Sequence, residues 1–274
     1  MDRLDYLPRD AHAAGVPYGE IDLNYILNSF RVSAGGVVGV DGKALPAAEH
    51  YLFARYYMHR AVYHHKTIYG FEEAARHLIR RIRDRAPREY KLPANGTEVE
   101  QLVCQDGFKS FTDSFLDRLM QDAVGDSEPI VSMIARSLLQ RRPPKLLREV
   151  VSLDRAGTIS GPAADFERNC RRRLPELAEH FAVSLSRFVF SRTRPLSVEK
   201  RGSDGSEQQE TELIHVFLDD EPEPRPIVEV DRSVVKQFAE FDLSVSRLYI
   251  IDDGTTDDGQ YGKLREAVRK WDTE

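Results

Sequence analysis

The sequence predicts a mainly α-helical protein with a small α+β lobe toward its carboxy-terminal end. Two observations carry this prediction. In roughly the first two-thirds of the 274-residue chain, apolar residues recur at the three- and four-residue spacing of amphipathic helices. Beyond that point, β-branched and aromatic runs of strand length alternate with polar segments. We place the change near residue 158, which predicts a helical domain at 1–158 and an α+β lobe at 159–274.

In the helical part, segments with apolar periodicity are bounded by Gly, Pro and polar residues. The expected helices, in chain order, cover 46–65, 71–85, 99–104 with its flanks, 108–122 and 128–139. The run Arg141-Arg142-Pro143-Pro144 ends the last of them. A short hairpin is expected earlier, where Phe30–Ser33 leads into a turn at Gly35-Gly36 followed by Val37-Val38.

In the carboxy-terminal part, strands predominate. A short apolar run at 146–153 is a strand candidate, and further strands are expected at 183–190, 211–218 and 244–251. A helix is expected at 166–181, with Pro175 kinking or splitting it. The last 15 residues, which include Trp271, are expected to form a terminal helix.

The bulk composition favours an ordinary cytoplasmic protein. The formal net charge of −6 gives no general electrostatic reason to expect nucleic acid or an anionic membrane as a partner. Cys104 and Cys170 lack the CxxC spacing of a zinc site and are too few for a disulfide framework. No signal peptide is recognisable, and no run approaches the ~20 apolar residues that span a bilayer.

Two stretches carry candidate chemistry, and the first lies at residues 2–12. On a helix, Asp2, Tyr6 and Asp10 share one face. Carboxylates can bind a divalent cation or accept hydrogen bonds from sugar hydroxyls, and a tyrosine ring can pack on a sugar or a base. From spacing alone, a charged and solvated first turn explains the same residues more simply. Pro8 removes one backbone donor, at small cost near a helix start.

The second stretch is "RYYMHRAVYHHK", in which Arg55, His59, Tyr63 and Lys66 lie on one stripe of a helix. Two cations, an imidazole and a phenol offer what a polyphosphate with an attached base requires. A metal site at His59, His64 and His65 is a weaker interpretation, because no HExxH or Cys/His pairing accompanies them. The spacing indicates an anionic ligand and names no reaction.

At these stretches the sequence resembles the HD superfamily of nucleotide hydrolases. "DRLDYLPRDAHAAGVPYGEIDLNYIL" is similar to the segment that begins with the family's last metal-binding aspartate, and "RYYMHRAVYHHK" to its nucleotide-contacting helix. "FTDSFLDRL" and the tail from "IHVFL" through "SRLYIID" to "REAVRKW" resemble later parts of the same enzymes. The resemblance, over nearly the whole chain, is to the carboxy-terminal half of deoxynucleoside triphosphate triphosphohydrolases of the sterile-alpha-motif/HD type and their bacterial relatives.

The resemblance implies metal-dependent hydrolysis of a deoxynucleoside triphosphate to a deoxynucleoside and triphosphate. It implies that Asp2 is a metal ligand and that Tyr6 and Asp10 recognise the deoxyribose and its 3′-hydroxyl. Arg3 and Arg55 match residues that contact the phosphates. The full set of predicted substrate-binding residues, with Lys66 added from the stripe, is Arg3, Tyr6, Asp10, Arg55, His59, Tyr63 and Lys66.

One departure from the family is large. The other metal ligands, a His and a His-Asp pair, precede the first motif in the family, and this sequence contains no His-Asp dipeptide. A divalent ion (Mg, Mn, Fe or Zn) is therefore expected only if the missing ligands are supplied, and the chain alone is expected to be inactive and of low stability. Three interpretations follow: Met1 is internal to a longer enzyme, a partner subunit completes the site, or the chain is a non-catalytic nucleotide-binding or oligomerisation module. Relatives commonly form dimers or tetramers, so a homo-oligomer is expected.

Overall fold

The structure is a computed structural model that describes residues 2–85, 89–90, 92–93, 95–104, 109, 112–155, 161–193, 196–198, 213–219, 221 and 223–272, without the side chains of residues 2, 3 and 272. Its contacts divide the chain into two compact units. The first unit comprises Met1–His65, Val151–Gly161 and Thr193–Val245, and the second comprises Lys66–Val150, Pro162–Arg192 and Ser246–Glu274. The predicted consecutive domains, 1–158 and 159–274, remain a prediction.

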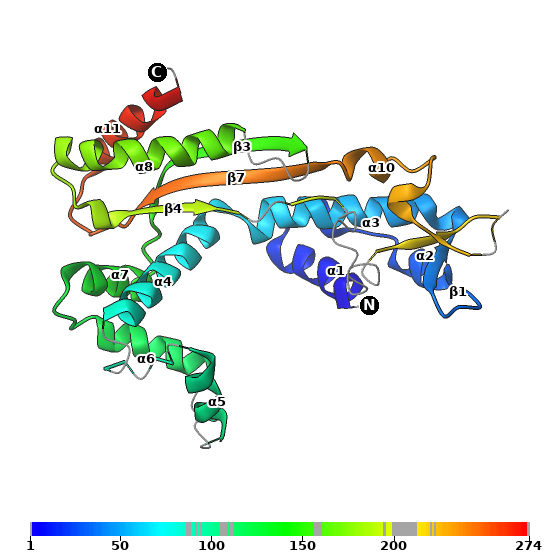
Figure 1. The fold of residues 1–274 in the computed structure, drawn as a ribbon, viewed down its shortest axis with the longest axis horizontal. Helices are drawn as coiled ribbons and strands as arrows, with labels where there is room; N and C mark the ends of the chain where they lie inside the picture. The colour runs from blue at the N-terminus through cyan, green and yellow to red at the C-terminus, as the bar shows by residue number, and fades with distance from the viewer. Residues whose placement is uncertain are drawn as a thin grey trace. The chain divides into compact units, whose positions relative to one another are not determined.

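The first unit consists of a small sheet and of the helices that lie before, between and after its strands in the sequence (Figure 1). Its elements are α1 (Asp2–Ala14), η1 (Pro17–Gly19), α2 (Leu23–Asn28), β1 (Phe30–Val32), β2 (Val38–Asp41), η2 (Gly42–Ala44), α3 (Leu45–Met58), the π-helical turn η3 (His59–Tyr63), β5 (His215–Phe217), β6 (Arg225–Pro226), η6 (Ile227–Glu229) and α10 (Val235–Phe238). The strand order is β1-β2-β5-β6. The β1–β2 pair is antiparallel, with Phe30 opposite Val40, so the predicted hairpin is confirmed.

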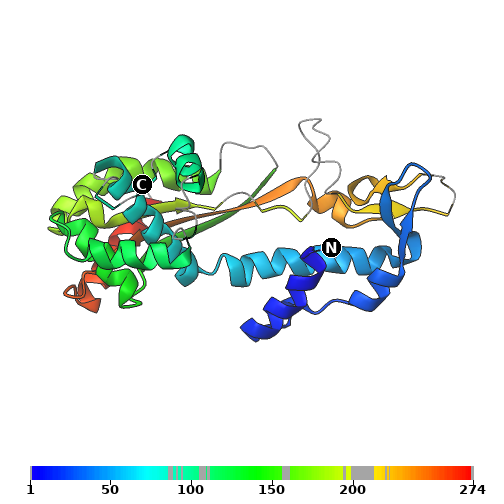
Figure 2. The ribbon, with the colours of Figure 1, turned by 90° about the horizontal axis from the view of Figure 1, so that it is seen from below.

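The core of this unit joins the first helix to the sheet. Leu7 and Ala11 of α1, Leu52 and Met58 of α3, and Val216 of β5 are all buried in one apolar cluster. Figures 1 and 2 show α1 beside α3. Burial of this shared apolar surface holds the amino-terminal helix in place.

The second unit has a three-stranded sheet in the order β3-β7-β4. Its elements are α4 (Lys66–Arg85), α5 (Gly96–Cys104), α6 (Asp113–Ala123), α7 (Pro129–Leu139), β3 (Lys145–Arg155), α8 (Pro162–His180), η5 (Leu185–Arg187), β4 (Phe188–Arg192), β7 (Phe241–Ile250), α11 (Asp258–Arg269) and η7 (Lys270–Asp272), with β3 and β7 also reaching into the first unit. Strands β4 and β7 are antiparallel, with Phe188 opposite Ile250.

Strand β7 has apolar residues on both faces because helices cover both sides of the sheet. Leu248 and Ile250 pack in a cluster with residues of α8 and α11. Tyr249 packs in a second cluster with residues of α4, α6 and α7. Successive side chains of a strand point to opposite faces, so one uninterrupted apolar run serves both cores.

The predicted fold class, mainly α with a small α+β part, is confirmed. Helix α7 and strand β3 match the expected segments closely, and α11 with η7 accounts for the terminal helix. Helix α4 begins earlier than predicted, at Lys66. Residues 108, 110 and 111, at the start of the helix expected at 108–122, lie outside the described residues.

Two local predictions are wrong. Residues 183–187 are not strand: they form a turn that ends in η5, and β4 begins only at Phe188. Of the kink or split predicted at Pro175, the split is wrong, because helix α8 runs on to His180. Residues 171 and 175 are both exposed, so the carbonyl that Pro175 leaves without a donor can be hydrated. Among the described residues, no helix is long and apolar enough to cross a membrane.

Candidate functional site

The candidate site begins with helix α1, which a close contact fixes against the following turn. A Cβ atom at Gly19 would lie 2.5 Å from the Ala11 Cβ and 2.6 Å from the Leu7 carbonyl oxygen. Only glycine allows the η1 backbone to approach α1 so closely. Because Leu7 and Ala11 are held in the core, Tyr6 and Asp10 are fixed on the adjacent face of the helix.

The second part of the site lies where α3 ends in a π-helical turn. The His64 N–H donates to the His59 carbonyl oxygen at 2.8 Å, which is the i→i+5 bond of a π-helix. The rings of His59 and Tyr63, at the two ends of this turn, meet edge to face with centroids 4.9 Å apart.

One hydrogen bond joins the two parts. The Tyr63 hydroxyl donates to a carboxylate oxygen of Asp10 at 2.8 Å, across 53 positions of sequence. The Tyr6 ring contacts the Tyr63 ring edge to face at 6.2 Å. Residues from the two sequence motifs thus form one cluster in the first unit.

Tyr63 is held as a hydrogen-bond donor. Burial of the phenol raises its pKa, and the hydrogen bond to the Asp10 carboxylate and the negative charge of that group raise it further. The phenol therefore stays protonated over the physiological pH range. Asp10, partly exposed, keeps acceptor capacity for a ligand hydroxyl.

Two arginines lie on these helices. Arg9 forms an ion pair with Asp5 at 2.9 Å, and its Nε lies 3.9 Å from an Asp10 oxygen. Arg55 is on α3, one turn before His59. Its Nε is buried and has no hydrogen-bond partner within the described part of the chain. Buried guanidinium donors are normally satisfied, so this unpartnered nitrogen is an exception.

The structure brings together four of the predicted substrate-binding residues, Tyr6, Asp10, His59 and Tyr63. Arg55 precedes them on the same helix. The expectation of one continuous stripe is wrong at Lys66, because the helix ends with η3 and Lys66 begins α4 in the second unit. The predicted roles of the Asp2 and Arg3 side chains lie outside the described residues.

A divalent metal has no site among the described side chains. No group of three or more His, Cys, Asp or Glu residues converges in the described ranges. The His59 and His64 rings contact one another edge to face at 5.8 Å, without a third ligand type beside them. These residues do not fit a metal by themselves, and no chemical step of this chain is derived through one.

Two features of the site escaped the sequence reasoning. Gly19 is an isolated glycine in "PYGEID", and nothing in that pattern predicts its contact with α1. The π-helical turn has no sequence signature either, although the cluster of aromatic and basic residues at 56–65 marks the place where it occurs.

Comparison with known proteins gives short sequence matches and long structural ones. No family model matches the chain. An uncharacterized protein of Methanocaldococcus jannaschii is 46% identical over 70 residues, which is 24% of this chain and 16% of that protein. The uncharacterized protein YwfO of Bacillus subtilis is 35% identical over 80 residues, 29% of this chain and 18% of that protein.

Two solved structures share the fold over most of this chain. A phosphohydrolase from Bacteroides thetaiotaomicron matches with a TM-score of 0.64 and 18% identity, covering 91% of this chain and 60% of that one. A hypothetical protein from Aquifex aeolicus matches with a TM-score of 0.62 and 20% identity, covering 97% of this chain and 56% of that one. The chain thus spans less than two-thirds of the length of either neighbour. It has the fold of part of a phosphohydrolase.

Proposed function

We propose that the chain forms the nucleotide-binding side of an HD-type phosphohydrolase that cleaves deoxynucleoside triphosphates to deoxynucleosides and triphosphate. The observation that carries the proposal is the Tyr63–Asp10 hydrogen bond, which joins the two family-like motifs in one cluster. The shared fold with a phosphohydrolase supports the reaction class. The sequence motifs support the substrate class.

Each residue then has a role that its chemistry allows. Asp10 accepts a hydrogen bond from the 3′-hydroxyl, and the Tyr6 ring packs on the deoxyribose. Arg55 contacts the terminal phosphate through its guanidinium group. His59 and Tyr63 border the nucleotide, and Arg3 adds positive charge along the phosphates. Asp2 contributes one carboxylate to the metal.

The remaining metal ligands belong, in this proposal, to a His and His-Asp segment outside these 274 residues. The chain contributes binding and orientation of the nucleotide, and activation of water is assigned to the completed site.

The same observation favours a second candidate, a nucleotide-binding module without catalysis. In that case the cluster at Asp10 and Tyr63 binds a deoxynucleoside triphosphate, and no hydrolysis follows. The two candidates differ in their dependence on metal, because removal of metal abolishes hydrolysis and leaves this binding intact.

The test uses the native protein isolated from its own cells. The expected result is a mass above the 31.3 kDa of this chain, or co-purification with a polypeptide that carries a His-Asp pair. With dATP it should release deoxyadenosine and triphosphate, and a chelator should stop the reaction. A protein of 31.3 kDa that binds dATP without hydrolysing it supports the second candidate. Release of inorganic phosphate or diphosphate in place of triphosphate contradicts the proposed reaction.

A further inference from the structure

The first unit carries a cluster of exposed aromatic and aliphatic side chains on α3 and the elements beside it. Tyr18, Tyr57, Phe238 and Val234 are 44%, 46%, 47% and 49% exposed. Single exposed apolar residues are common on protein surfaces, whereas a contiguous apolar patch marks an interaction site. We call these four residues, together with the partly buried Phe53, the aromatic patch.

Ring contacts and helix spacing make the aromatic patch continuous. The rings of Tyr18 and Tyr57 are stacked, with centroids 6.1 Å apart. The rings of Phe53 and Phe238 meet edge to face at 5.4 Å, which joins α10 to α3 (Figure 1). Phe53 and Tyr57 are one turn apart on α3, and Val234 precedes α10 by one residue, four positions before Phe238. The patch therefore extends from η1 across α3 to α10, within the first unit.

Two opposite charges lie on the same face of this helix, one at each end of the aromatic patch. Glu49 is near the start of α3, and one of its carboxylate oxygens accepts the Val234 backbone N–H at 2.8 Å. Arg60 follows Tyr57 by three residues, where α3 passes into η3, and its exposed side chain lies beside Tyr56. Neither charge forms an ion pair with another residue that the structure describes.

This surface is complementary to itself when it is reversed. If two copies place α3 antiparallel about a twofold axis, Glu49 of one copy faces Arg60 of the other. Phe53 and Tyr57 of both copies then meet in the middle, between the two charge pairs. An aromatic centre with charged residues at the rim is the usual composition of a protein–protein interface.

We propose that the aromatic patch is the interface at which two copies of this chain associate. Single-stranded nucleic acid fits less well, because the rings that stack on bases usually lie along a positively charged groove, and the two charges here have opposite signs. A different protein would not require these charges to lie symmetrically about the rings, whereas a second copy does.

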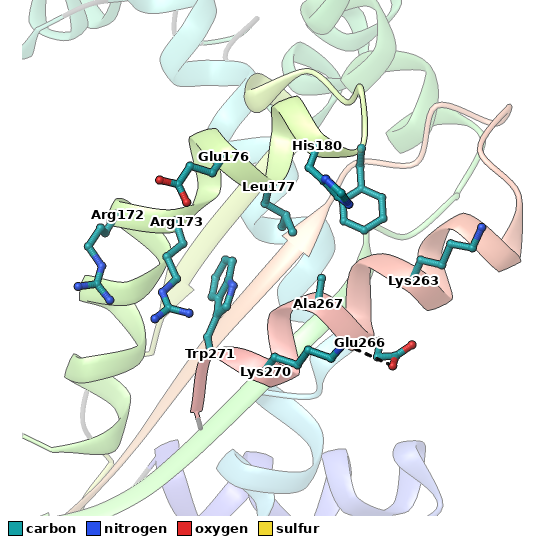
Figure 3. Close-up of a pocket in the computed structure, with 11 residues that line it drawn as sticks. Arg172, Arg173, Glu176, Leu177, His180, Lys263, Glu266, Ala267, Lys270 and Trp271 are labelled. Atoms are coloured by element: carbon teal, nitrogen blue, oxygen red, sulfur yellow. Dashed lines mark ion pairs between the residues drawn. The ribbon is translucent and has the colours of Figure 1, made fainter. Parts of the chain in front are cut away.

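The groove between α8 and α11 in the second unit gives no comparable indication of a partner. Figure 3 shows the side chains that line it, with an ion pair between Lys270 and Glu266 at 3.8 Å. Charges that pair within the chain do not identify a partner. Glu49 and Arg60 differ in this respect, since no ion pair of the described residues includes them.

Sedimentation equilibrium of the full chain over a range of concentrations tests the proposal. We expect a reversible dimer with twice the 31.3 kDa mass of the chain. Tyr57→Ala should weaken this dimer at least about tenfold, the equivalent of ~1.4 kcal/mol, because central tyrosines contribute strongly to interfaces. Tyr25→Ala is the matched control and should associate normally, since Tyr25 is also 46% exposed and lies on α2, outside the aromatic patch.

Charge reversal tests the antiparallel geometry. Glu49→Arg and Arg60→Glu, each alone, place like charges opposite one another and should weaken the dimer about threefold or more. The double variant restores opposite charges and should associate as the unaltered chain does. If a reversed variant does not fold, the comparison of Tyr57→Ala with Tyr25→Ala decides.

Four results would overturn the proposal. They are a monomer at every concentration, equal weakening by Tyr57→Ala and Tyr25→Ala, a double charge variant that associates no more tightly than the single ones, and saturable binding of oligothymidylate by a monomeric chain.

Discussion

At the scale of single residues, the hydrogen bond from Tyr63 to Asp10 is the contact on which the candidate site depends. We expect Tyr63→Phe to lower the free energy of unfolding by about 1.5 kcal/mol, because a hydrogen bond to a partly exposed carboxylate contributes at the low end of the range for charged partners. Urea denaturation measures it. Tyr25→Phe is the matched control, since its hydroxyl makes only a long, exposed bond of 3.3 Å to the Lys43 carbonyl.

A double-mutant cycle distinguishes this bond from general packing. Tyr63→Phe combined with Asp10→Ala should show a coupling free energy of about 1 kcal/mol. Strictly additive effects of the two substitutions would mean that the bond contributes nothing to stability.

A second residue-scale prediction concerns the buried ion pair of Arg187 and Asp253, whose atoms approach to 2.6 Å. Burial alone would raise the pKa of Asp253, but hydrogen bonds from the Thr255 and Thr256 backbone and the charge of Arg187 outweigh it and lower the pKa to about 2. The ordinary value is about 3.9. A depressed folded-state pKa stabilises the protein above pH ~4, and this contribution is lost as the pH falls toward 2.

Asp253→Asn should therefore destabilise the protein at neutral pH and reduce the loss of stability between about pH 4 and pH 2. Breaking a buried pair on one side costs ~3–5 kcal/mol when the other charge stays buried. Thermal melts across this pH range measure the effect, with the exposed Asp258→Asn as control. If the stability of Asp253→Asn and of the unaltered protein changed with pH in parallel, the lowered pKa of Asp253 would be refuted.

At the scale of elements, two glycines make opposite predictions. Gly19→Ala should lower the free energy of unfolding by about 1–3 kcal/mol, because its Cβ would overlap Ala11 and the Leu7 carbonyl. Gly262→Ala, in helix α11 with nothing within 4 Å of the new Cβ, should raise it by about 0.5–1 kcal/mol. Chemical denaturation compares the two. No loss of stability in Gly19→Ala would contradict the packing of η1 on α1.

The periodicity of apolar residues predicted most helices of this fold, because an amphipathic helix shows its buried face as a regular spacing in the sequence. The prediction failed where tertiary contacts determine the local backbone structure. Residues 183–190 read as one strand, but Arg187 is buried and hydrogen-bonds to the Ile251 carbonyl and Thr256, which fixes a turn before Phe188. Because the partner of Arg187 lies 64 residues away, the sequence around Arg187 does not reveal this turn.

At the scale of the whole molecule, the sequence predicted which residue types form the candidate site more readily than how they meet. Each of the two motifs can be recognised in the sequence by itself. The hydrogen bond between Tyr63 and Asp10 depends on the packing of α1 against α3, which neither motif specifies. Lys66 does not lie on the predicted stripe, because the π-helical turn ends the helix before this residue.

The central claim, that this chain holds the nucleotide-binding side of the site, is tested most directly by calorimetric titration of the full chain with dATP in the presence of a chelator. We expect saturable binding that weakens at least about tenfold in Asp10→Asn, since a hydrogen bond to a charged group contributes ~1.5–3 kcal/mol. Asp5→Asn, an exposed carboxylate on the same helix, should bind as the unaltered chain does. Equal affinity in both variants, or no binding by the unaltered chain, would contradict the account.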